Sequence, residues 1–202
     1  FANLGCQEIN FEALNFSGDI EVDSGLDFGT VHESIGNRNY WENCSPGESD
    51  KWLSLTAATE RNRIHVFSAF RVECDSVIDF RISKEEKKIY RRLKIHLQRF
   101  HATAFKKFVV NYTDKKTHGK ALEVNSRGRK IAGSLALISM DQLRKNHTDC
   151  WQKVWDNNDI VIEGDPENQQ GIRYCIFQLY QTNHGEDPSN NVGAKGLTGE
   201  IY

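Results

Sequence analysis

The residues best suited to chemistry stand close together near the end of the sequence, within 193–200. Three glycines recur there at every third position, with Gly196 in the middle, and they let the backbone approach a ligand closely. Lys195, Thr198 and Glu200 add one cation, one hydroxyl and one carboxylate. The spacing matches neither G-x-G-x-x-G nor the P-loop motif, which disfavours nucleotide binding. Two interpretations remain open for this segment: an exposed flexible loop and a ligand-binding loop.

A second candidate, Asp165, stands where a helix is predicted to begin. It can act as the N-cap, because Pro166 fits the first helical position and Glu167 complements the helix dipole. Apolar residues further along cover more than half of the helix circumference, at 172, 175–177, 179 and 180. Such a helix should be buried on two sides. The simpler role of Asp165 is that of a helix cap, and contact with a ligand is the alternative.

Composition and cysteine spacing exclude several functional classes. Lys and Arg number 26 against 28 Asp and Glu, and the net charge of −2 gives no electrostatic footprint for nucleic acid. No run approaches the ~18 apolar residues of a membrane span. The five cysteines are Cys6, Cys44, Cys74, Cys150 and Cys175. They form no C-x-x-C pair, there is no H-E-x-x-H motif, and the close pairs His96/His101 and His147/Cys150 have no third ligand nearby, so we expect free thiols in a reducing compartment and no metal site.

Alternation of apolar and polar residues predicts β-strands over the first hundred or so residues. In the run 63–72, Val66 and Phe70 share one face. Phe67 and Arg71 share the other face, and the run 93–97 alternates in the same way. Shorter strands are predicted at 52–56, 77–82 and 105–112, with turns at the Gly, Asp, Asn and Ser clusters 17–19, 23–25 and 47–50. Short strands separated by turns are typical of an antiparallel β-sandwich.

The pattern becomes helical after a polar turn at 114–120. Ser139 and Gln142 fit a capping box, and apolar residues then follow at three- and four-residue steps to about Asp156. Trp151 and Trp155 lie on this stripe. Packing against a neighbouring domain is the favoured interpretation of both tryptophans, and a platform for sugar stacking is the alternative. Strands first and helices afterwards, without β-α alternation, predict an α+β chain of separate domains.

Several stretches between 162 and 200 occur together in a known family. The segments Ile162–Asp165, Gln169–Tyr174, Phe177–Leu179, Gln181–Thr182, Gly185–Asp187 and Gly193–Glu200 closely resemble glycoside hydrolase family 65, the family of maltose, trehalose, kojibiose and nigerose phosphorylases. Residues 1–112 resemble the later part of its N-terminal β-sandwich. The resemblance implies a partial β-sandwich over 1–117, a helical linker over 118–160, and over 161–202 the start of an (α/α)6 barrel whose first helix is about 166–181. We therefore expect a piece of a larger protein, with the apolar stripe of 172–180 left uncovered.

The activity implied by the resemblance is inverting phosphorolysis of an α-glucoside to β-glucose 1-phosphate and a free sugar. Inverting transfer needs one carboxylic acid to protonate the leaving oxygen, and inorganic phosphate, already an anion, attacks without a second carboxylate as base. In the family the general acid and the phosphate loop follow much later, so we expect no catalytic residue within 1–202 and no activity of the chain alone. The substrate-binding residues it contributes are then Asp165, Lys195, Gly196, Thr198 and Glu200.

The resemblance also implies partners and a compartment. The partners are a disaccharide substrate and inorganic phosphate as co-substrate, with no other cofactor and with neither nucleic acid nor a membrane. Homodimers are common in the family, so a homodimer is the implied assembly. The implied compartment is the cytoplasm. Two alternative functions stay open. One is an α-glucoside hydrolase of the same family, in which water replaces phosphate. The other is a non-catalytic β-sandwich that binds carbohydrate or forms a subunit interface.

Overall fold

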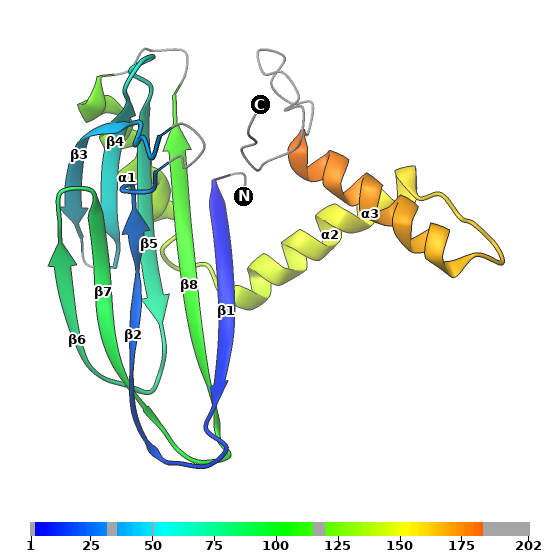
Figure 1. Ribbon diagram of the computed structural model, residues 1–202, viewed down its shortest axis with the longest axis horizontal. Coiled ribbons are helices and arrows are strands. Elements are labelled where there is room, and N and C mark those ends of the chain that lie inside the picture. Colours follow the sequence, from blue (N-terminus) through cyan, green and yellow to red (C-terminus); the bar gives the residue numbers. More distant parts are fainter. Residues whose placement is uncertain (1–2, 32–35, 50, 115–119, 184–202) are drawn as a thin grey trace. The chain divides into compact units, whose positions relative to one another are not determined.

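The structure, a computed structural model, describes residues 3–31, 36–49, 51–114 and 120–183. Within these ranges eight strands come first and three helices follow (Figure 1). The strands are β1 (Leu4–Glu12), β2 (Gly18–Asp27), β3 (Trp41–Glu48), β4 (Leu53–Thr59), β5 (His65–Glu73), β6 (Val77–Lys84), β7 (Lys88–Leu97) and β8 (Ala102–Thr113). The helices are α1 (Ala121–Ser134), α2 (Met140–Asn158) and α3 (Pro166–Thr182).

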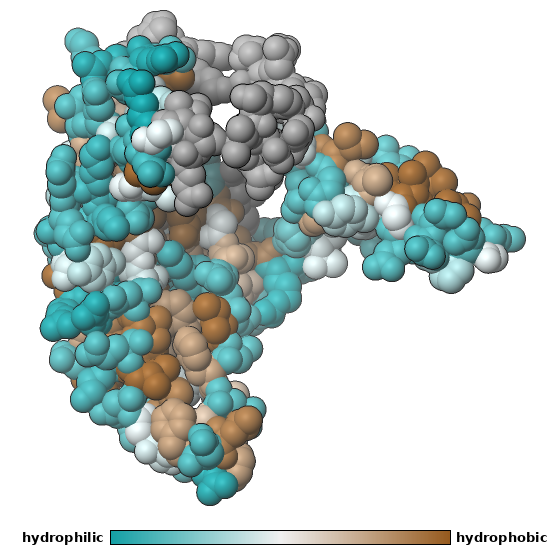
Figure 2. Space-filling model, viewed as in Figure 1, coloured by the Kyte–Doolittle hydropathy of each residue, from teal (hydrophilic) through white to brown (hydrophobic). Residues whose placement is uncertain are grey.

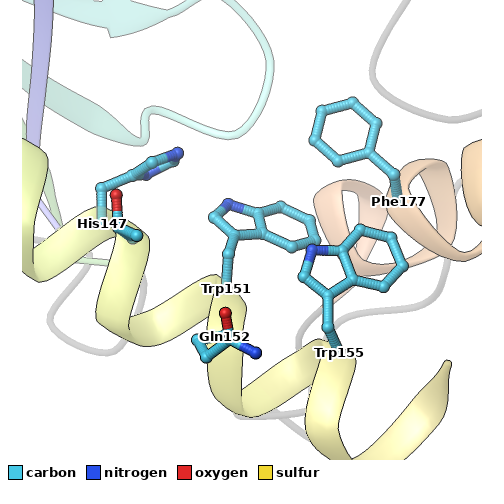
Figure 3. A pocket seen from close by; sticks show the side chains of 6 residues that line it. His147, Trp151, Gln152, Trp155 and Phe177 are labelled. Atoms are coloured by element: carbon cyan, nitrogen blue, oxygen red, sulfur yellow. The ribbon is translucent and has the colours of Figure 1, made fainter.

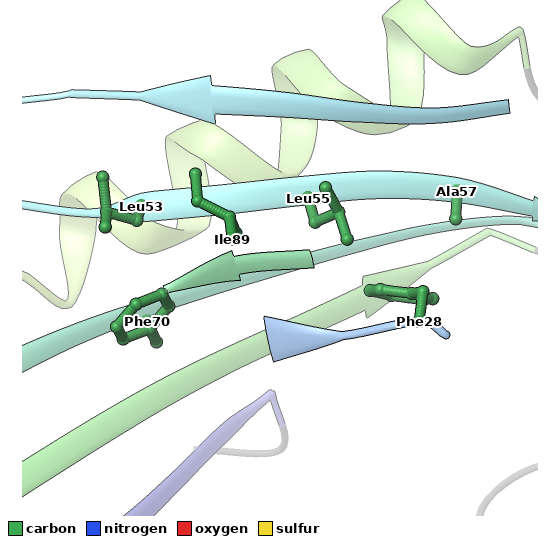
Figure 4. Close-up of a cluster of buried hydrophobic side chains, with 6 residues drawn as sticks. All are labelled: Phe28, Leu53, Leu55, Ala57, Phe70 and Ile89. Atoms are coloured by element: carbon green, nitrogen blue, oxygen red, sulfur yellow. The ribbon is translucent and has the colours of Figure 1, made fainter. Parts of the chain in front are cut away.

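The strands form two antiparallel sheets with the hydrophobic core between them. The five-stranded sheet has the order β1-β8-β5-β4-β3, and the three-stranded sheet the order β2-β7-β6. One core cluster consists of Phe28, Leu53, Leu55, Ala57, Phe70 and Ile89 (Figure 4). A second cluster gathers around Leu93, Ile95 and Phe105. The predicted antiparallel β-sandwich followed by helices is confirmed, because each sheet buries its apolar face against the other.

The central strand β5 is buried on both faces, although its sequence alternates. Phe70 belongs to the core between the sheets. On the opposite face Phe67 and Arg71 are only 1% and 5% exposed, because α1 packs on this side of β5. A β-carbon on Gly128 of α1 would lie 2.2 Å from the Phe67 ring, so the helix backbone lies directly on the sheet. The alternation of apolar and polar residues therefore predicts the strand correctly. The burial of its second face follows from the packing of α1 on that face.

One predicted turn cluster lies inside a strand, and the other two, 17–19 and 47–50, overlap the start of β2 and the end of β3. The prediction of a turn at 23–25 is wrong, because these residues belong to β2, where Gly25 lies opposite Tyr90. A β-carbon on Gly25 would lie 2.4 Å from the Tyr90 β-carbon, so glycine is needed here for close approach. The turn predicted at 47–50 begins too early, since Gly47 belongs to β3 and makes room for the Arg129 guanidinium. Glycine serves close packing as well as turns, and local sequence does not distinguish the two uses.

A row of ion pairs joins β2 to β7 on the outer face of the three-stranded sheet. Acidic residues of β2 lie beside basic residues of β7 along the register of the two strands. The pairs are Asp19 with Lys94 (2.9 Å), Asp23 with Arg92 (2.5 Å) and Asp27 with Lys88 (3.0 Å). A slip of one residue would turn every acidic side chain toward the core, so this charge pattern supports the observed register.

We expect these ion pairs to make stability depend on pH at the acid end. Hydrogen bonds with His96 and Lys94 lower the pKa of Asp19, and hydrogen bonding to Arg92 lowers the pKa of Asp23, in both cases from an ordinary value of 3.8. A carboxyl with a lowered pKa stabilises the folded state above pH 3.8, and this contribution is lost as the pH falls through the lowered value. Urea midpoints measured from about pH 5 to about pH 2 should therefore fall less steeply in an Asp19→Asn, Asp23→Asn double variant than in the wild type. Parallel profiles would contradict this role.

By its internal contacts the chain divides into two compact units, Phe1–Met140 and Asp141–Tyr202. The first contains the sandwich and α1, which contacts β4, β5 and β8. The second contains most of α2 and all of α3. The helix predicted over 139–156 is α2, and the helix predicted from Pro166 is α3. The domain boundaries expected at 117 and 160 stay predictions.

A buried cation, Arg71, fastens the segment between α1 and α2 to the sandwich. Its Nη2 donates to the Ile138 carbonyl at 2.9 Å, and its Nη1 donates to the Glu73 carboxylate. The guanidinium carbon lies 3.6 Å from the Phe108 ring centre and 5.5 Å from that of Trp52. Burial lowers the pKa of Arg71. The negative faces of the two rings offset part of this desolvation cost.

Candidate functional site

Of the five predicted substrate-binding residues, the structure describes one, Asp165. Lys195, Gly196, Thr198 and Glu200 lie outside the described residues. Asp165 stands at the end of the connection between α2 and α3, directly before Pro166. The described part of the site therefore consists of this connection and the two helices that hold it.

Asp165 is the N-cap of α3, as predicted. Its Oδ1 accepts a hydrogen bond from the backbone N–H of Asn168 at 3.0 Å, and its Oδ2 accepts one from Nδ2 of Asn168 at 2.6 Å. The backbone hydrogen bond contributes most to the lowered pKa of the Asp165 carboxyl. The carboxylate is thus held ionised and in one orientation by the helix it caps. Contact of Asp165 with a sugar stays a prediction.

Replacing Asp165 by alanine should loosen the start of α3. The Asn168 N–H would lose its acceptor, because the first N–H groups of a helix have no partner within the helix. We expect faster amide exchange in the first turn of α3, measured by hydrogen-exchange mass spectrometry. Asp165→Asn is the matched control, since its side-chain oxygen still accepts the hydrogen bond and exchange should stay close to wild type. Wild-type exchange in Asp165→Ala would contradict the capping role.

Two residues of α3 hold the connection that precedes the helix. Oε1 of Gln169 accepts from the Ile162 N–H at 2.6 Å, and its Nε2 donates to the Ile160 carbonyl at 2.9 Å. Arg173 forms a bidentate ion pair with Asp159, with N–O distances of 2.9 and 2.6 Å. Hydrogen bonding within this pair raises the pKa of Arg173 and lowers that of Asp159. The backbone before Asp165 is therefore fixed by side chains rather than by regular secondary structure.

The positioning roles of Gln169 and Arg173 are not predicted by the sequence, in which both residues are only part of the stretch that resembles the family. A glutamine and an arginine on an exposed helix surface show no distinctive pattern, because their partners are backbone groups and a carboxylate in the preceding segment. The bidentate geometry of the Arg173–Asp159 pair depends on the turn of the chain at Gly164, whose φ is +80°.

Three aromatic rings from α2 and α3 pack together (Figure 3). The ring centres of Trp151 and Trp155 are 5.8 Å apart at an angle of 27°, and Trp151 lies 4.9 Å from Phe177 of α3. Beside them are hollows of about 370 and 510 Å³. The first is lined by these rings with His147, Thr148 and Gln152; the second by Trp155, Pro166, Gln169, Gln170, Arg173, Tyr174 and Phe177. The contacts among the rings favour the packing interpretation of the tryptophans.

The described residues show neither a metal cluster nor a membrane-spanning helix. Residues 3–183, apart from the gaps in the described ranges, bring together no group of three or more His, Cys, Asp or Glu side chains able to hold a metal ion. In the same residues no helix has the length and apolar character needed to cross a membrane. All five cysteines are free thiols.

Comparison with known proteins gives the chain a family. A family model described as "Glycosyl hydrolase family 65, N-terminal domain" matches residues 2–154. Maltose phosphorylase of Bacillus subtilis is 30% identical over 213 residues, which cover 100% of this chain and 27% of that protein. Kojibiose phosphorylase of Caldanaerobacter subterraneus subsp. tengcongensis is 30% identical over 207 residues, which cover 94% of this chain and 26% of that protein.

A solved structure agrees with these sequence matches. The putative kojibiose phosphorylase from human microbiome superimposes with a TM-score of 0.87 at 27% identity, over 98% of this chain and 26% of that one. The chain thus spans about a quarter of the length of the relatives it matches. The curated relatives are named as phosphorylases, which are enzymes. The match of the family model over most of the chain shows that this protein belongs to glycosyl hydrolase family 65.

Proposed function

We propose that this chain is the N-terminal part of an inverting disaccharide phosphorylase. The reaction is cleavage of an α-glucoside by inorganic phosphate, giving β-glucose 1-phosphate and a free sugar. The observation that carries the proposal is the similarity to proteins named maltose and kojibiose phosphorylase along 94–100% of this chain, sandwich and helices together. The proposed partners are the disaccharide and phosphate, and a homodimer is the proposed assembly. The five free thiols support a reducing compartment such as the cytoplasm.

We assign substrate binding, rather than bond cleavage, to this part of the protein. An inverting phosphorylase needs one acid for the leaving oxygen and a pocket that aligns phosphate on the opposite face of the sugar. We place the acid outside 1–202 and assign sugar contact to Asp165, Lys195, Gly196, Thr198 and Glu200. The fixed connection before α3 supports this assignment for Asp165, because a carboxylate held in one orientation loses little entropy when a sugar hydroxyl binds.

We also propose that residues 161–202 begin an (α/α)6 barrel, after a sandwich over 1–117 and a linker over 118–160. The support comes from the apolar surface that α3 leaves open. Among its described residues only Ile176 is buried, while Tyr174 and Leu179 are 61% and 65% exposed. Apolar side chains are visible on the surface of the helical unit (Figure 2). An exposed stripe of this kind is what a helix of a larger helical domain would bury.

The test of the function uses the protein expressed from its complete gene. It is incubated with maltose, trehalose, kojibiose or nigerose, with and without phosphate, and the products are followed by proton NMR. We expect phosphate-dependent release of glucose 1-phosphate from one of these disaccharides, with the β-anomer appearing first. Residues 1–202 alone should release no product.

Two outcomes would overturn the proposed function. Release of free glucose at the same rate without phosphate would identify an α-glucoside hydrolase. No turnover of any α-glucoside, together with sugar binding by residues 1–160 alone, would identify a non-catalytic carbohydrate-binding module.

A further inference from the structure

Two buried N–H groups of the first unit have no hydrogen-bond partner among the described residues. They are Nε of Arg71 in β5 and Nε1 of Trp52, the residue directly before β4. Both side chains are only 5% exposed. Any further part of the protein would add to this burial rather than reduce it. A buried donor without an acceptor is costly, and the cost is larger for a charged group.

The two donors belong to neighbouring positions on one face of the five-stranded sheet. Leu53 of β4 lies opposite Phe70 of β5, so the register brings Trp52 beside Arg71. The guanidinium carbon of Arg71 lies 5.5 Å from the centre of the Trp52 ring. Phe108 of β8 lies opposite Arg71, and its ring centre is 3.6 Å from the same carbon. The unpartnered N–H groups thus form one cluster, with the cation between two aromatic rings.

The charge of Arg71 is compensated only in part by its described partners. Nη2 donates to the Ile138 carbonyl, and Nη1 donates to the Glu73 carboxylate, whose side chain is 51% exposed. A half-exposed carboxylate is screened by water, so it compensates a buried cation incompletely. Glu73 also contacts Nη1, on a different edge of the guanidinium from the Nε–H group. The surroundings of this N–H group therefore still favour a negative charge.

We propose that the N–H groups of Arg71 Nε and Trp52 Nε1 together bind a chloride ion. Both groups are donors only, so their ligand must be an acceptor. A water molecule would bring two hydrogens that need acceptors of their own, and the rings of Trp52 and Phe108 offer none. An anion needs no further partner and gains a charge-assisted hydrogen bond from the guanidinium. Because the cluster is buried, the anion must be small, and chloride is monatomic.

The test compares amide exchange of the protein from its complete gene in mixtures of sodium chloride and sodium gluconate. The total salt concentration is constant, and gluconate is too large for a buried site, so the mixtures differ only in the ligand. A ligand that binds only the closed state slows exchange by the factor 1 + [L]/Kd. Exchange in β5 and in the segment 135–139, followed by mass spectrometry, should slow about tenfold as chloride rises from a tenth of its Kd to ten times its Kd.

Each donor can be removed with little change of shape or charge. Trp52→Phe keeps an aromatic ring without Nε1–H, and Arg71→Lys keeps the positive charge without Nε–H. The Kd for chloride should rise about tenfold or more in both variants. Trp41→Phe is the matched control, because Trp41 packs against Phe28 at 4.7 Å in the core between the sheets, and this variant should respond to chloride like the wild type. Circular dichroism should show the same sandwich in all four proteins.

Crystals of the wild type soaked in sodium bromide give a second readout that needs no variant. We expect an anomalous peak between Arg71 and Trp52. Equal exchange in chloride and gluconate would overturn the proposal and leave water as the acceptor. A chloride response that Trp41→Phe loses as fully as Trp52→Phe, or crystals without this bromide peak, would also overturn it. The site does not depend on the proposed reaction, and none of these measurements depends on activity.

Discussion

Gly128→Ala should destabilise the first unit by about 2 kcal/mol, although alanine is the better helix former. The added β-carbon would lie 2.2, 2.3 and 2.8 Å from three carbons of Phe67, a side chain that is only 1% exposed. Either the Phe67 ring or α1 must then move, and overpacking of this kind typically costs about 1–3 kcal/mol. The helix-propensity gain of up to about 1 kcal/mol offsets only part of that cost.

The same helix offers a matched control for this prediction. Gly133 has nothing within 4 Å of its β-carbon position, so Gly133→Ala should stabilise the protein by up to about 1 kcal/mol. Urea unfolding of both variants measures the contrast. Combining Gly128→Ala with Phe67→Leu should recover part of the lost stability, because the smaller side chain gives way to the new methyl group. If Gly128→Ala and Gly133→Ala have the same effect, α1 does not lie directly on β5.

Arg71→Ala should cost about 3 kcal/mol of unfolding free energy. The substitution leaves the Ile138 carbonyl without its donor and opens a space beside the rings of Phe108 and Trp52. Arg71→Met should cost less, because it fills most of the volume and needs no desolvation of a charge. Amide exchange in the segment between α1 and α2 should rise in both variants, since both lose the hydrogen bond to Ile138.

An exposed arginine provides the comparison for Arg71. Arg63 pairs with Glu42 at 2.7 Å, but the two side chains are 61% and 42% exposed. Arg63→Ala should therefore change stability by less than about 1 kcal/mol. Urea unfolding and hydrogen exchange of the Arg71 and Arg63 variants distinguish the two cases. An Arg71→Ala protein as stable as Arg63→Ala would show that Arg71 does not fasten the segment that leads into α2.

Local sequence patterns predicted those strands and helices in which the buried residues recur with the repeat of the strand or helix itself, or in which a helix start is marked by adjacent residues. The alternation of 93–97 falls in β7, and Asp165-Pro166-Glu167 marks the first residues of α3, because an N-cap is built from its own neighbours. The predictions of turns were wrong where a glycine makes room for a side chain of a distant element. Gly25 faces Tyr90, and the glycine at 47 faces Arg129, so signals typical of a turn occur within strands.

The sequence by itself determined the order of strands and helices, the cap at Asp165 and the family resemblance, since each depends on residues that are neighbours along the chain or on a shared motif. Only the tertiary structure decided which face of β5 is covered, why Arg71 is buried, and how Gln169 and Arg173 hold the connection before Asp165. These features depend on contacts between segments far apart in sequence or on hydrogen bonds to backbone groups. Such contacts follow from packing and register rather than from the period of any single element.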